Sequence, residues 1–561
     1  MSQSQDVLEE QILENNDDHD FVETSPGKKE SGNDNNANSN NTCLVEKTSE
    51  NVNNDNDVHE PFVEEEISDI DNNYVFVVLL FVDPMFPAND RSLYPFETQE
   101  RLAVLRIKQK IPKVVEWKRP HEIVHSPQFI AGRPSRFDVI QGQLENCWLL
   151  AAIAVIAEHE DLFGRVVPTD QRFDEDYKGK FHFQFWHFGD WVDIVIDDRL
   201  PTVGGKLIYS QLPSNNAFWS VLLEKAYAKL HGGYANLDGG HTVEGLQDFT
   251  GGLTCPLWTN SMTSTDLLPW LKRGLNMGSL YGATIHPQNN EAGDGPVMEN
   301  GLTGGHSYSV TALLLSKEVK LIRLRDPWGN DRLWNGSWSV KSKEWTSLDQ
   351  AIKNHLTPPT LHDGEFWMSF NDFWENFHQI DVCHLKADIY NEMAHTRSDE
   401  KIPYLSGGNG WIQHHAHGEW STAQGTAGGD RSCDSHHLNP QYRIKTPPLP
   451  DANGNDKVNV IVALTQKNSR KMRSGEPQNV HIGFYVYEVA TESTLGADFF
   501  QNKDTRSLTS TFINFREISE PMEVNSGEYV IVPCTHAPNV NAKFLLRVFS
   551  DRPVEIRKLS I

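Results

Sequence analysis

A helix that is apolar on every face begins within the segment Gln141-Gly-Gln-Leu-Glu-Asn-Cys-Trp-Leu-Leu-Ala-Ala-Ile-Ala-Val-Ile-Ala157. Asn146 is a residue type that favours the N-cap position, and the residues that follow it are all apolar. A helix without a polar face must be surrounded by other elements, so the sequence predicts a buried central helix. Cys147 occupies its first turn, where aligned backbone N–H groups favour the thiolate over the thiol.

Two patterns follow this helix along the chain. Alternating apolar residues predict strands, and an apolar run closed by Gly232-Gly233 predicts a second helix. Beyond Gly251-Gly252 strands dominate, so we expect a helix-bearing unit over residues 73–254 and a strand-rich unit over 255–390. The predicted elements are strands at 180–186, 191–197, 307–315 and 319–325 and the second helix at 218–230.

The C-terminal third is predicted to be an all-β unit. Helical patterns vanish beyond about residue 400, and short alternating runs separated by Gly, Asn and Pro take their place. This spacing is typical of an antiparallel β-sandwich, which we place at residues 400–551 with a short tail at 552–561. The runs are 457–464, 480–488, 528–533 and 543–549.

The composition separates a polar tail from this globular part. The chain has 561 residues and a net charge of −27, of which residues 1–70 carry −16, and residues 1–72 are predicted to be a disordered acidic, Asn-rich tail. An acidic chain without a long basic stripe argues against nucleic acid as a partner. No signal peptide is apparent, the longest strongly apolar run is 74–82, and the cysteines form no CxxC pair, so we expect a soluble cytoplasmic protein.

Three residues predict nucleophilic chemistry. A cysteine nucleophile needs a histidine base and a third group to orient the imidazole. His306 follows Gly304-Gly305 at the start of a predicted strand, and Asp326 ends the next strand, two residues before Trp328. The order Cys, His, Asp therefore fits a thiol protease, although from the residues alone a Cys and His without a common function remain an alternative.

At these residues the chain resembles the calpain family. The similarity extends over about residues 75–551 and includes the segments that contain Cys147, His306 and Asp326. The matching segments are Gln141–Ala152, Trp219–Lys229, Asp248–Gly252, Gly301–Thr311, Leu321–Gly329, Asp363–Phe370 and Phe544–Ser550.

The resemblance implies an α+β, papain-like two-lobed protease core followed by a C2-like sandwich, and limited proteolysis of cytosolic and cytoskeletal proteins. It implies that Cys147 is the nucleophile and His306 the acid and base, that Gln141 donates to the oxyanion, and that Trp328 shields the histidine. The third triad residue is Asp326, where the family has Asn. We expect activity to be retained with a shifted pH profile, because a carboxylate favours the imidazolium.

The family also implies calcium, held in each lobe by carboxylates and backbone carbonyls. Asp138 and Glu224 match the acidic ligands of the first site, and Asp363 and Glu365 match those of the second. Two apolar residues stand where the second site of the family has further acidic residues. We therefore expect the first site to bind Ca2+ and the second to be weak or empty.

Further expectations concern partners. Only ten residues follow Asp551, so the resemblance stops before the EF-hand domain of the family, and we expect a monomer without a small subunit. The basic run Lys467–Arg473 is interpreted as a solvated loop, with calcium-dependent contact to an anionic membrane surface as the alternative. His414-His415-Ala-His417 is interpreted as a surface cluster in a Gly-rich loop and not as a metal site.

The leading interpretation is thus a calcium-regulated cysteine endopeptidase acting on protein substrates. A catalytically impaired calpain-like scaffold is the first alternative, supported by the altered triad and the eroded second calcium site. An acyltransferase of the transglutaminase type is the second, because it shares the three residue types.

Overall fold

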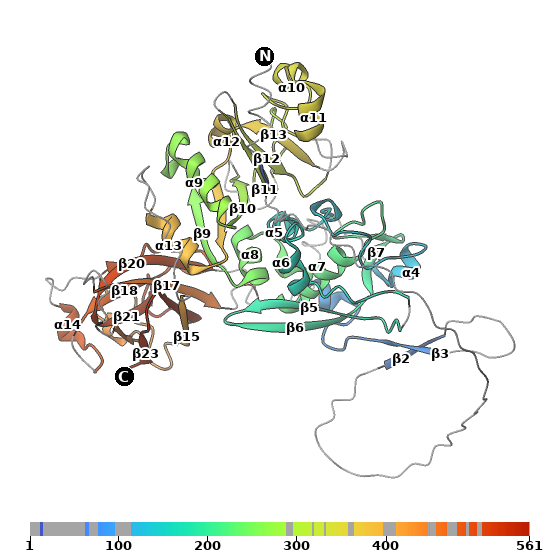
Figure 1. Ribbon diagram of the computed structural model, residues 1–561. Coiled ribbons are helices and arrows are strands. Elements are labelled where there is room, and N and C mark those ends of the chain that lie inside the picture. Colours follow the sequence, from blue (N-terminus) through green and yellow to red (C-terminus); the bar gives the residue numbers. More distant parts are fainter. Residues whose placement is uncertain are drawn as a thin grey trace, which may run out of the picture.

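The computed structural model describes residues 12–14, 62–66, 77–95, 114–174, 176–287, 295–316, 319–329, 333–356, 364–395, 411–446, 448, 456–467, 470, 479–489, 493–501 and 508–559. Figure 1 shows these residues in three bodies. We call them lobe 1 (62–66 and the described residues of 77–250), lobe 2 (12–14 and the described residues of 253–395) and the sandwich (the described residues of 411–559). None of the helices in the described part of the chain is long and apolar enough to cross a lipid bilayer.

Lobe 1 is built around helix α5 (Cys147–Ile156), every residue of which is buried. Helices α7 (Trp219–His231) and α8 (Thr242–Thr250) and the hairpin β5–β6 (Lys180–His187 and Asp190–Asp197) share its hydrophobic core. The prediction of a buried central helix is confirmed. The remaining elements are β2 (Phe62–Glu66), β3 (Val77–Phe81), α2 (Asp90–Leu93), β4 (Glu116–Lys118), α4 (Pro120–Ile123), η1 (Arg136–Asp138), α6 (Glu160–Val166), β7 (Leu200–Val203), β8 (Lys206–Leu207) and η2 (Tyr234–Leu237).

Lobe 2 is an antiparallel sheet in the order β13-β12-β11-β10-β14-β9, with β1 added to β11. Leucines of α9 and phenylalanines of α12 cover one face of this sheet, against Tyr281 and Tyr308. Ser309 on β11 donates to the carbonyl of Ala151 in α5 (3.0 Å), so the sheet also contacts lobe 1. The elements are β1 (Ile12–Glu14), β9 (Leu253–Trp258), η3 (Thr259–Ser261), α9 (Ser264–Asn276), β10 (Leu280–Ile285), β11 (His306–Leu315), β12 (Lys320–Arg325), α10 (Lys343–Ser347), α11 (Gln350–Leu356), β13 (Glu365–Ser369), α12 (Phe370–Asn376), β14 (Gln379–His384) and α13 (Ala387–His395).

The sandwich consists of one sheet in the order β15-β22-β17-β20 and a second in the order β19-β18-β21-β16-β23. Alternate residues of both sheets form one hydrophobic core that includes Trp420, Tyr442 and Phe484. The prediction of an antiparallel β-sandwich is confirmed, but the prediction of a separate tail at residues 552–561 is wrong, because β23 pairs with β16 as an edge strand of the second sheet. Its elements are β15 (Ile412–Trp420), η4 (His436–Leu438), β16 (Tyr442–Thr446), β17 (Lys457–Lys467), β18 (Ile482–Glu488), α14 (Ala497–Gln501), β19 (Leu508–Thr509), β20 (Glu517–Asn525), β21 (Gly527–Thr535), β22 (Ala542–Ser550) and β23 (Glu555–Lys558).

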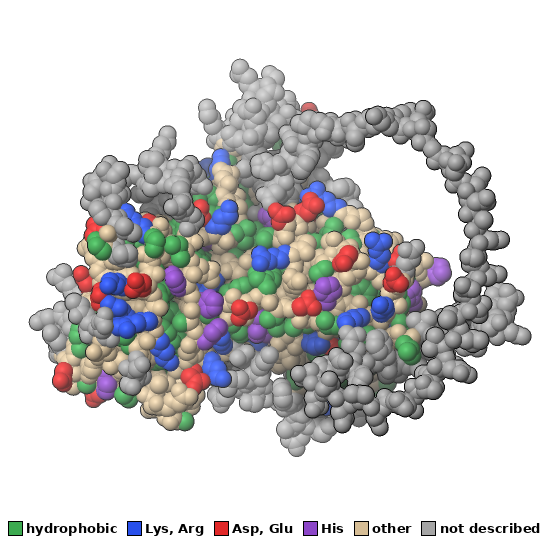
Figure 2. Space-filling view, turned by 60° about the horizontal axis from the view of Figure 1, so that its bottom comes forward, with side chains coloured by type: hydrophobic (Ala, Val, Ile, Leu, Met, Phe, Trp, Pro, Cys, Tyr) green, Lys and Arg blue, Asp and Glu red, His purple; other side chains and the backbone are tan. Residues whose placement is uncertain are grey.

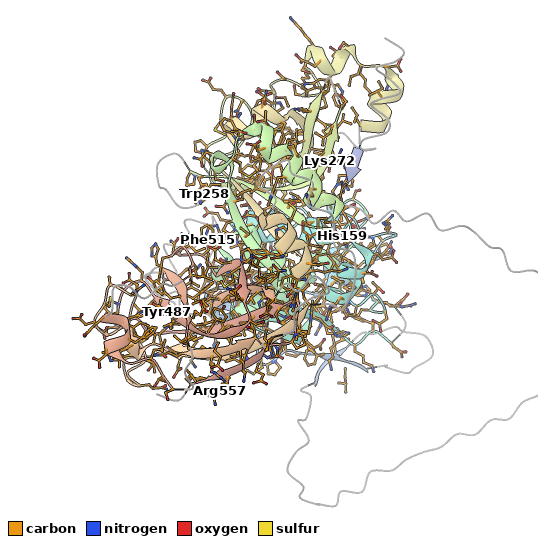
Figure 3. All side chains as sticks on the ribbon, turned by 60° about the vertical axis from the view of Figure 1, so that its left-hand side comes forward. His159, Trp258, Lys272, Tyr487, Phe515 and Arg557 are labelled. Carbon is orange, nitrogen blue, oxygen red and sulfur yellow. The ribbon has the colours of Figure 1, made fainter. Side chains whose placement is uncertain are left out.

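The sandwich packs against the protease part. Phe515 lies at this junction in Figure 3, whereas Tyr487 and Arg557 lie farther out. The ring of Phe515 contacts the ring of His241 in lobe 1, with centroids 4.5 Å apart. Figure 2 shows the face where the sandwich meets the β5–β6 side of lobe 1, on which side chains of both charges are interspersed. The sandwich is therefore in direct contact with lobe 1.

Several local predictions need correction. Asn146 lies at the N-cap, but its side chain makes no capping bond because it donates to Glu224 instead. The histidines of residues 414–417 lie on the edge strand β15 and not in a loop, because that segment pairs with β22 along its whole length. Arg470 is buried and paired with Glu244, so it does not belong to a solvated loop; most of the basic run around it lies outside the described residues. Within the tail, residues 12–14 and 62–66 form strands, and the rest of residues 1–72 lies outside the described residues.

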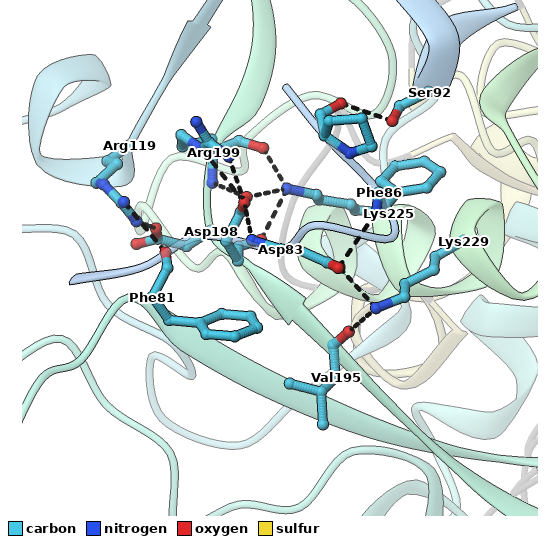
Figure 4. A network of polar contacts seen from close by, with 12 residues as sticks. Phe81, Asp83, Phe86, Ser92, Arg119, Val195, Asp198, Arg199, Lys225 and Lys229 are labelled. Carbon is cyan, nitrogen blue, oxygen red and sulfur yellow. Dashed lines mark hydrogen bonds and ion pairs between the residues drawn. The ribbon is translucent and has the colours of Figure 1, made fainter. Parts of the chain in front are cut away.

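A buried polar network fixes the entry of the chain into lobe 1 (Figure 4). Lys225 on α7 is fully buried and donates to the Asp197 carboxylate (2.6 Å). The same carboxylate accepts from the backbone N–H of Asp83 (2.9 Å), whose side chain accepts from Lys229 (2.6 Å). Because each buried charge has an opposite charge beside it, the network ties the segment after β3 to α7.

Two buried histidines make stability depend on pH. Burial lowers the pKa of His231 to about 4 and that of His384 to about 3, so both are neutral in the folded protein. In the unfolded chain they take up protons below about pH 6.5. The two histidines therefore do not lower the stability well above pH 6.5, and the stability falls as the pH drops below 6.5, toward about 4 for His231 and about 3 for His384.

We expect the free energy of urea-induced unfolding to fall by about 3–4 kcal/mol between pH 7 and pH 5 through these two groups. His384→Gln should remove about half of that loss, and His415→Gln, at an exposed position on β15, should leave it unchanged. Equal pH dependence in wild type and His384→Gln would contradict this assignment.

Candidate active site

Cys147 is the first residue of α5 and is almost completely buried (6% exposed). The N–H groups of Leu149 and Leu150 donate to the Asn146 carbonyl, so regular helical hydrogen bonding begins at this point. The first N–H groups of a helix lack partners within the helix and carry partial positive charge. Cys147 forms no disulfide, and its thiol lies where a thiolate is stabilised.

His306 and Asp326 come together because β11 and β12 are antiparallel neighbours. His306 begins β11 and Asp326 follows the last residue of β12, so both lie at the same end of the sheet. His306 Nε2 lies 2.9 Å from Asp326 Oδ1, and both residues are fully or almost fully buried. Since Asp326 orients the ring through Nε2, Nδ1 is the ring nitrogen able to exchange a proton with a thiol.

Aromatic rings enclose the histidine. The ring of Trp328 lies 4.8 Å from that of His306 at an angle of 47°, and Tyr308 contacts the same imidazole edge-on at 5.0 Å. The backbone N–H of Trp328 also donates to Asp326 Oδ1 (2.9 Å). The hydrogen bond between the imidazole and the carboxylate is thus excluded from water, which strengthens it.

Gln141 lies between the two lobes. Its backbone N–H donates to the carbonyl of Pro327 (2.9 Å), one residue before the shielding tryptophan. Its side-chain Nε2 donates to the carbonyl of Leu144 (2.9 Å), and the residue is buried. This contact uses one of the two amide hydrogens, so the second could stabilise an oxyanion.

Among the described residues, several polar contacts join the lobes around this site. The strongest is a buried ion pair in which Arg136 Nε donates to Glu365 Oε1 (2.6 Å). Glu365 lies at the start of β13, and its pKa is lowered despite burial, because Arg323 and Arg136 stand beside it. Others join Gln141 to Pro327, Ser309 to Ala151, and Arg325 to the carbonyl of Val139 (2.7 Å).

The sandwich contacts the residue beside the nucleophile. The guanidinium of Arg470 lies 4.0 Å from the ring of Trp148 and forms a buried ion pair with Glu244 on α8 (2.7 Å). It also donates to the carbonyls of Asn236 and Gly239. The start of α5 is therefore held from the sandwich as well as from lobe 1.

The first pair of predicted calcium ligands lies in lobe 1, but it is occupied by N–H donors. Asp138 accepts from Trp219 Nε1 (3.1 Å) and Glu224 from Asn146 Nδ2 (2.7 Å) and the backbone of Ser210 (3.0 Å). Burial raises the pKa of Glu224. These carboxylates brace the start of α5 and α7, an arrangement that does not fit a calcium ion as it stands.

Of the second pair, only Glu365 belongs to the described residues. Glu365 is engaged by arginines, as described above, and Asp363 lies outside the described residues. In the part of the chain that the structure describes, no three His, Cys, Asp or Glu side chains are grouped so that they could hold a metal ion.

Comparison with known proteins places this geometry in a class. A model of calpain family cysteine proteases matches residues 81–384, and a model of domain III of the calpain large subunit matches residues 416–549. The chain is 44% identical over 485 residues to Calpain clp-4 of Caenorhabditis elegans, covering 84% of this chain and 66% of that protein. It is 39% identical over 498 residues to the Calpain-1 catalytic subunit of Gallus gallus, covering 86% and 66%.

These matches define a class of cysteine proteases. The chain belongs to the calpain family, and the resemblance noted in the sequence is confirmed. It spans slightly less than two thirds of the length of these relatives.

The aspartate of the triad gives a testable pH effect. A carboxylate beside the imidazole favours its protonated form, whereas an amide orients the ring without adding charge. We expect Asp326→Asn to retain activity and to shift the alkaline limb of kcat/KM to lower pH by about one unit or more. A peptide-hydrolysis pH profile identical to that of wild type would contradict this electrostatic role.

Sequence patterns missed the residues that support the site from a distance. Arg136 and Glu365 are 229 positions apart, and Glu244 and Arg470 are 226 apart. Each is an ordinary charged residue within its own segment. Glu244 alone of these four gave a signal, because it is a single charge within the glycine-rich stretch 239–245, where a solvated surface does not require it.

Proposed function

We propose that this chain is a cysteine endopeptidase that cleaves proteins through a thioester on Cys147. The observation that carries the proposal is the 2.9 Å contact between His306 Nε2 and Asp326 Oδ1, buried beneath Trp328 at the end of a sheet that contacts the helix of Cys147. Such a pair orients a histidine for proton exchange with a nucleophile.

The reaction follows from these roles. The Cys147 thiolate attacks the carbonyl carbon of the scissile peptide, and the Cys147 N–H and Gln141 stabilise the oxyanion. The imidazolium of His306 then gives its proton to the leaving amine as the C–N bond breaks, which leaves a thioester. A water molecule gives a proton to His306 and attacks the thioester carbon; the C–S bond breaks, the carboxylic acid leaves, and the thiolate–imidazolium pair is restored.

Other parts of the proposal come from the family. Its members are generally calcium-regulated, and we extend calcium regulation to this chain. We also propose papain-like and C2-like relationships for the protease core and the sandwich, protein substrates of the cytosol and cytoskeleton, and action as a cytoplasmic monomer. Calcium-dependent contact of the sandwich with a membrane surface belongs to the same proposal.

Casein hydrolysis with and without added calcium tests the function, with Cys147→Ala as the matched control. Wild type is expected to release acid-soluble peptides when calcium is present, and the folded control is expected to release none. Release of peptides by Cys147→Ala, or no release by folded wild type at any calcium concentration, would overturn the proposal. In the second case a scaffold role would account for the fold better.

A further inference from the structure

The main chain passes from lobe 1 to lobe 2 through Gly251 and Gly252, between α8 and β9. Gly251 ends α8 with a φ of +72°, and a Cβ there would lie 2.9 Å from the ring of Trp186. A Cβ on Gly252 would lie 2.5 Å from Cys383 Sγ. Glycine is thus required at both positions, and in so enclosed a segment the backbone carbonyls need partners.

One arginine of the sandwich partners both carbonyls. Arg547 on β22 donates from Nη1 to the carbonyl of Gly251 (2.7 Å) and from Nη2 to that of Gly252 (3.0 Å). The arginine is fully buried, and its guanidinium lies 4.7 Å from the centre of the Trp186 ring. The planar fork of arginine suits two neighbouring acceptors, which a lysine cannot hold in the same way.

A carboxylate extends this contact to the first strand of lobe 2. Arg547 Nη2 also donates to Glu517 Oε2 (2.6 Å). The other oxygen of Glu517 accepts from the backbone N–H and the hydroxyl of Thr254 on β9 (3.1 Å each). Thr465 of the sandwich donates to Glu517 as well (2.6 Å). The buried pair Arg547–Glu517 therefore binds the main chain at Gly251 and Gly252 and also at Thr254.

These contacts lie between the elements that carry Cys147 and His306. Helix α8 packs closely on α5, since a Cβ on Gly245 would lie 2.8 Å from that of Ala152. On the other side, β9 pairs with β14, which pairs with β10 beside β11. A change of angle at Gly251 and Gly252 would therefore move α5, with Cys147, relative to β11, with His306.

We propose that Arg547 and Glu517 are positioning residues for the protease reaction, which hold the two-glycine hinge and thereby the relative orientation of Cys147 and His306. This inference rests on the proposed function. The sandwich then contributes to catalysis without touching the substrate. A misplacement of about 1 Å between reacting groups can reduce a rate about 100-fold, so a small change at the hinge has a measurable effect.

Arg547→Lys in the full chain tests this proposal, and Arg443→Lys is its matched control. Arg443 is also a buried sandwich arginine with a carboxylate partner, Glu528 (2.5 Å), but it lies in the other sheet. The readouts are kcat and KM for a fluorogenic peptide, the rate constant for alkylation of Cys147 by iodoacetamide, and the thermal midpoint. Arg547→Lys is expected to lower kcat and the alkylation constant about 10- to 100-fold with KM nearly unchanged. The control is expected to change both less than about twofold.

Thr254→Val is a second, milder variant. It removes the hydroxyl contact to Glu517 and leaves the backbone N–H contact in place. We expect kcat and the alkylation rate constant to fall less than in Arg547→Lys. If wild type cleaves casein but Arg547→Lys matches Arg443→Lys in kcat and alkylation, the hinge proposal is overturned and the proposed function stands. A rise in kcat would also overturn it. Wild type that cleaves nothing would overturn both.

Discussion

Replacing His306 with alanine is expected to lower kcat/KM by about 10³- to 10⁶-fold, because loss of one member of a nucleophile-base pair removes nearly all of its effect. In the proposed mechanism the imidazole gives its proton to the leaving amine and is the partner that favours ionisation of the Cys147 thiol. Its fixed orientation by Asp326 and Trp328 supports both roles. The measurement is hydrolysis of a fluorogenic peptide at saturating calcium.

His286→Ala is the control for this substitution. His286 follows Ile285, which pairs in the sheet with His306, so it is another histidine at the same end of lobe 2. Its Nε2 contacts Gln379 rather than Asp326. We expect kcat/KM to change only a few-fold in this variant. Comparable losses in the two variants would show that the effect is structural and not specific to the proposed base.

The second large effect is expected from the ion pair between the lobes. Glu365→Ala would remove the buried carboxylate that Arg136 and Arg323 share and leave Arg136 with Glu158 as its carboxylate partner. Removing one partner of a buried pair typically costs about 3–5 kcal/mol, because the remaining charge stays desolvated. We expect a fall of several degrees in the thermal midpoint and a loss of at least about 100-fold in kcat/KM as the lobes separate.

Glu523→Ala is the matched control for the interlobe pair, since Glu523 forms an exposed ion pair with Lys457 in the sandwich. Exposed pairs contribute about 0–1 kcal/mol, so little change is expected in either quantity. The account of lobe closure would be wrong if Glu365→Ala kept wild-type kcat/KM despite a lowered thermal midpoint.

Local patterns were sufficient to predict much of the fold. The apolar run after Asn146 could only be a buried helix, and the alternation in residues 180–197 and 457–464 could only suit strands. They failed where a long-range partner decided the outcome. Residues 414–417 looked like a loop because three histidines lack apolar alternation, yet they pair with residues of β22 that lie 128 to 134 positions later in the sequence.

The candidate site shows the same limit. Cys147, His306 and Asp326 could be selected by residue type and their place at element ends, since these positions have few structural uses. The residues that hold these three in place could not be predicted from the sequence. Whether Glu224 binds a cation or braces Asn146 depends on which donors the fold brings to it, and no spacing in the sequence encodes that choice.

The most direct test of the central claim is the pH dependence of Cys147 alkylation by iodoacetamide in wild type and in His306→Ala, with calcium present. An ordinary thiol reacts with a pKa of about 8.5, whereas a thiol paired with an imidazolium ionises well below that. We predict that wild type reacts rapidly and with little pH dependence from about pH 6 to 8, and that His306→Ala reacts slowly at pH 6 and gains rate only toward pH 8–9. Identical profiles for the two proteins, with an inflection near the ordinary thiol value, would contradict the account.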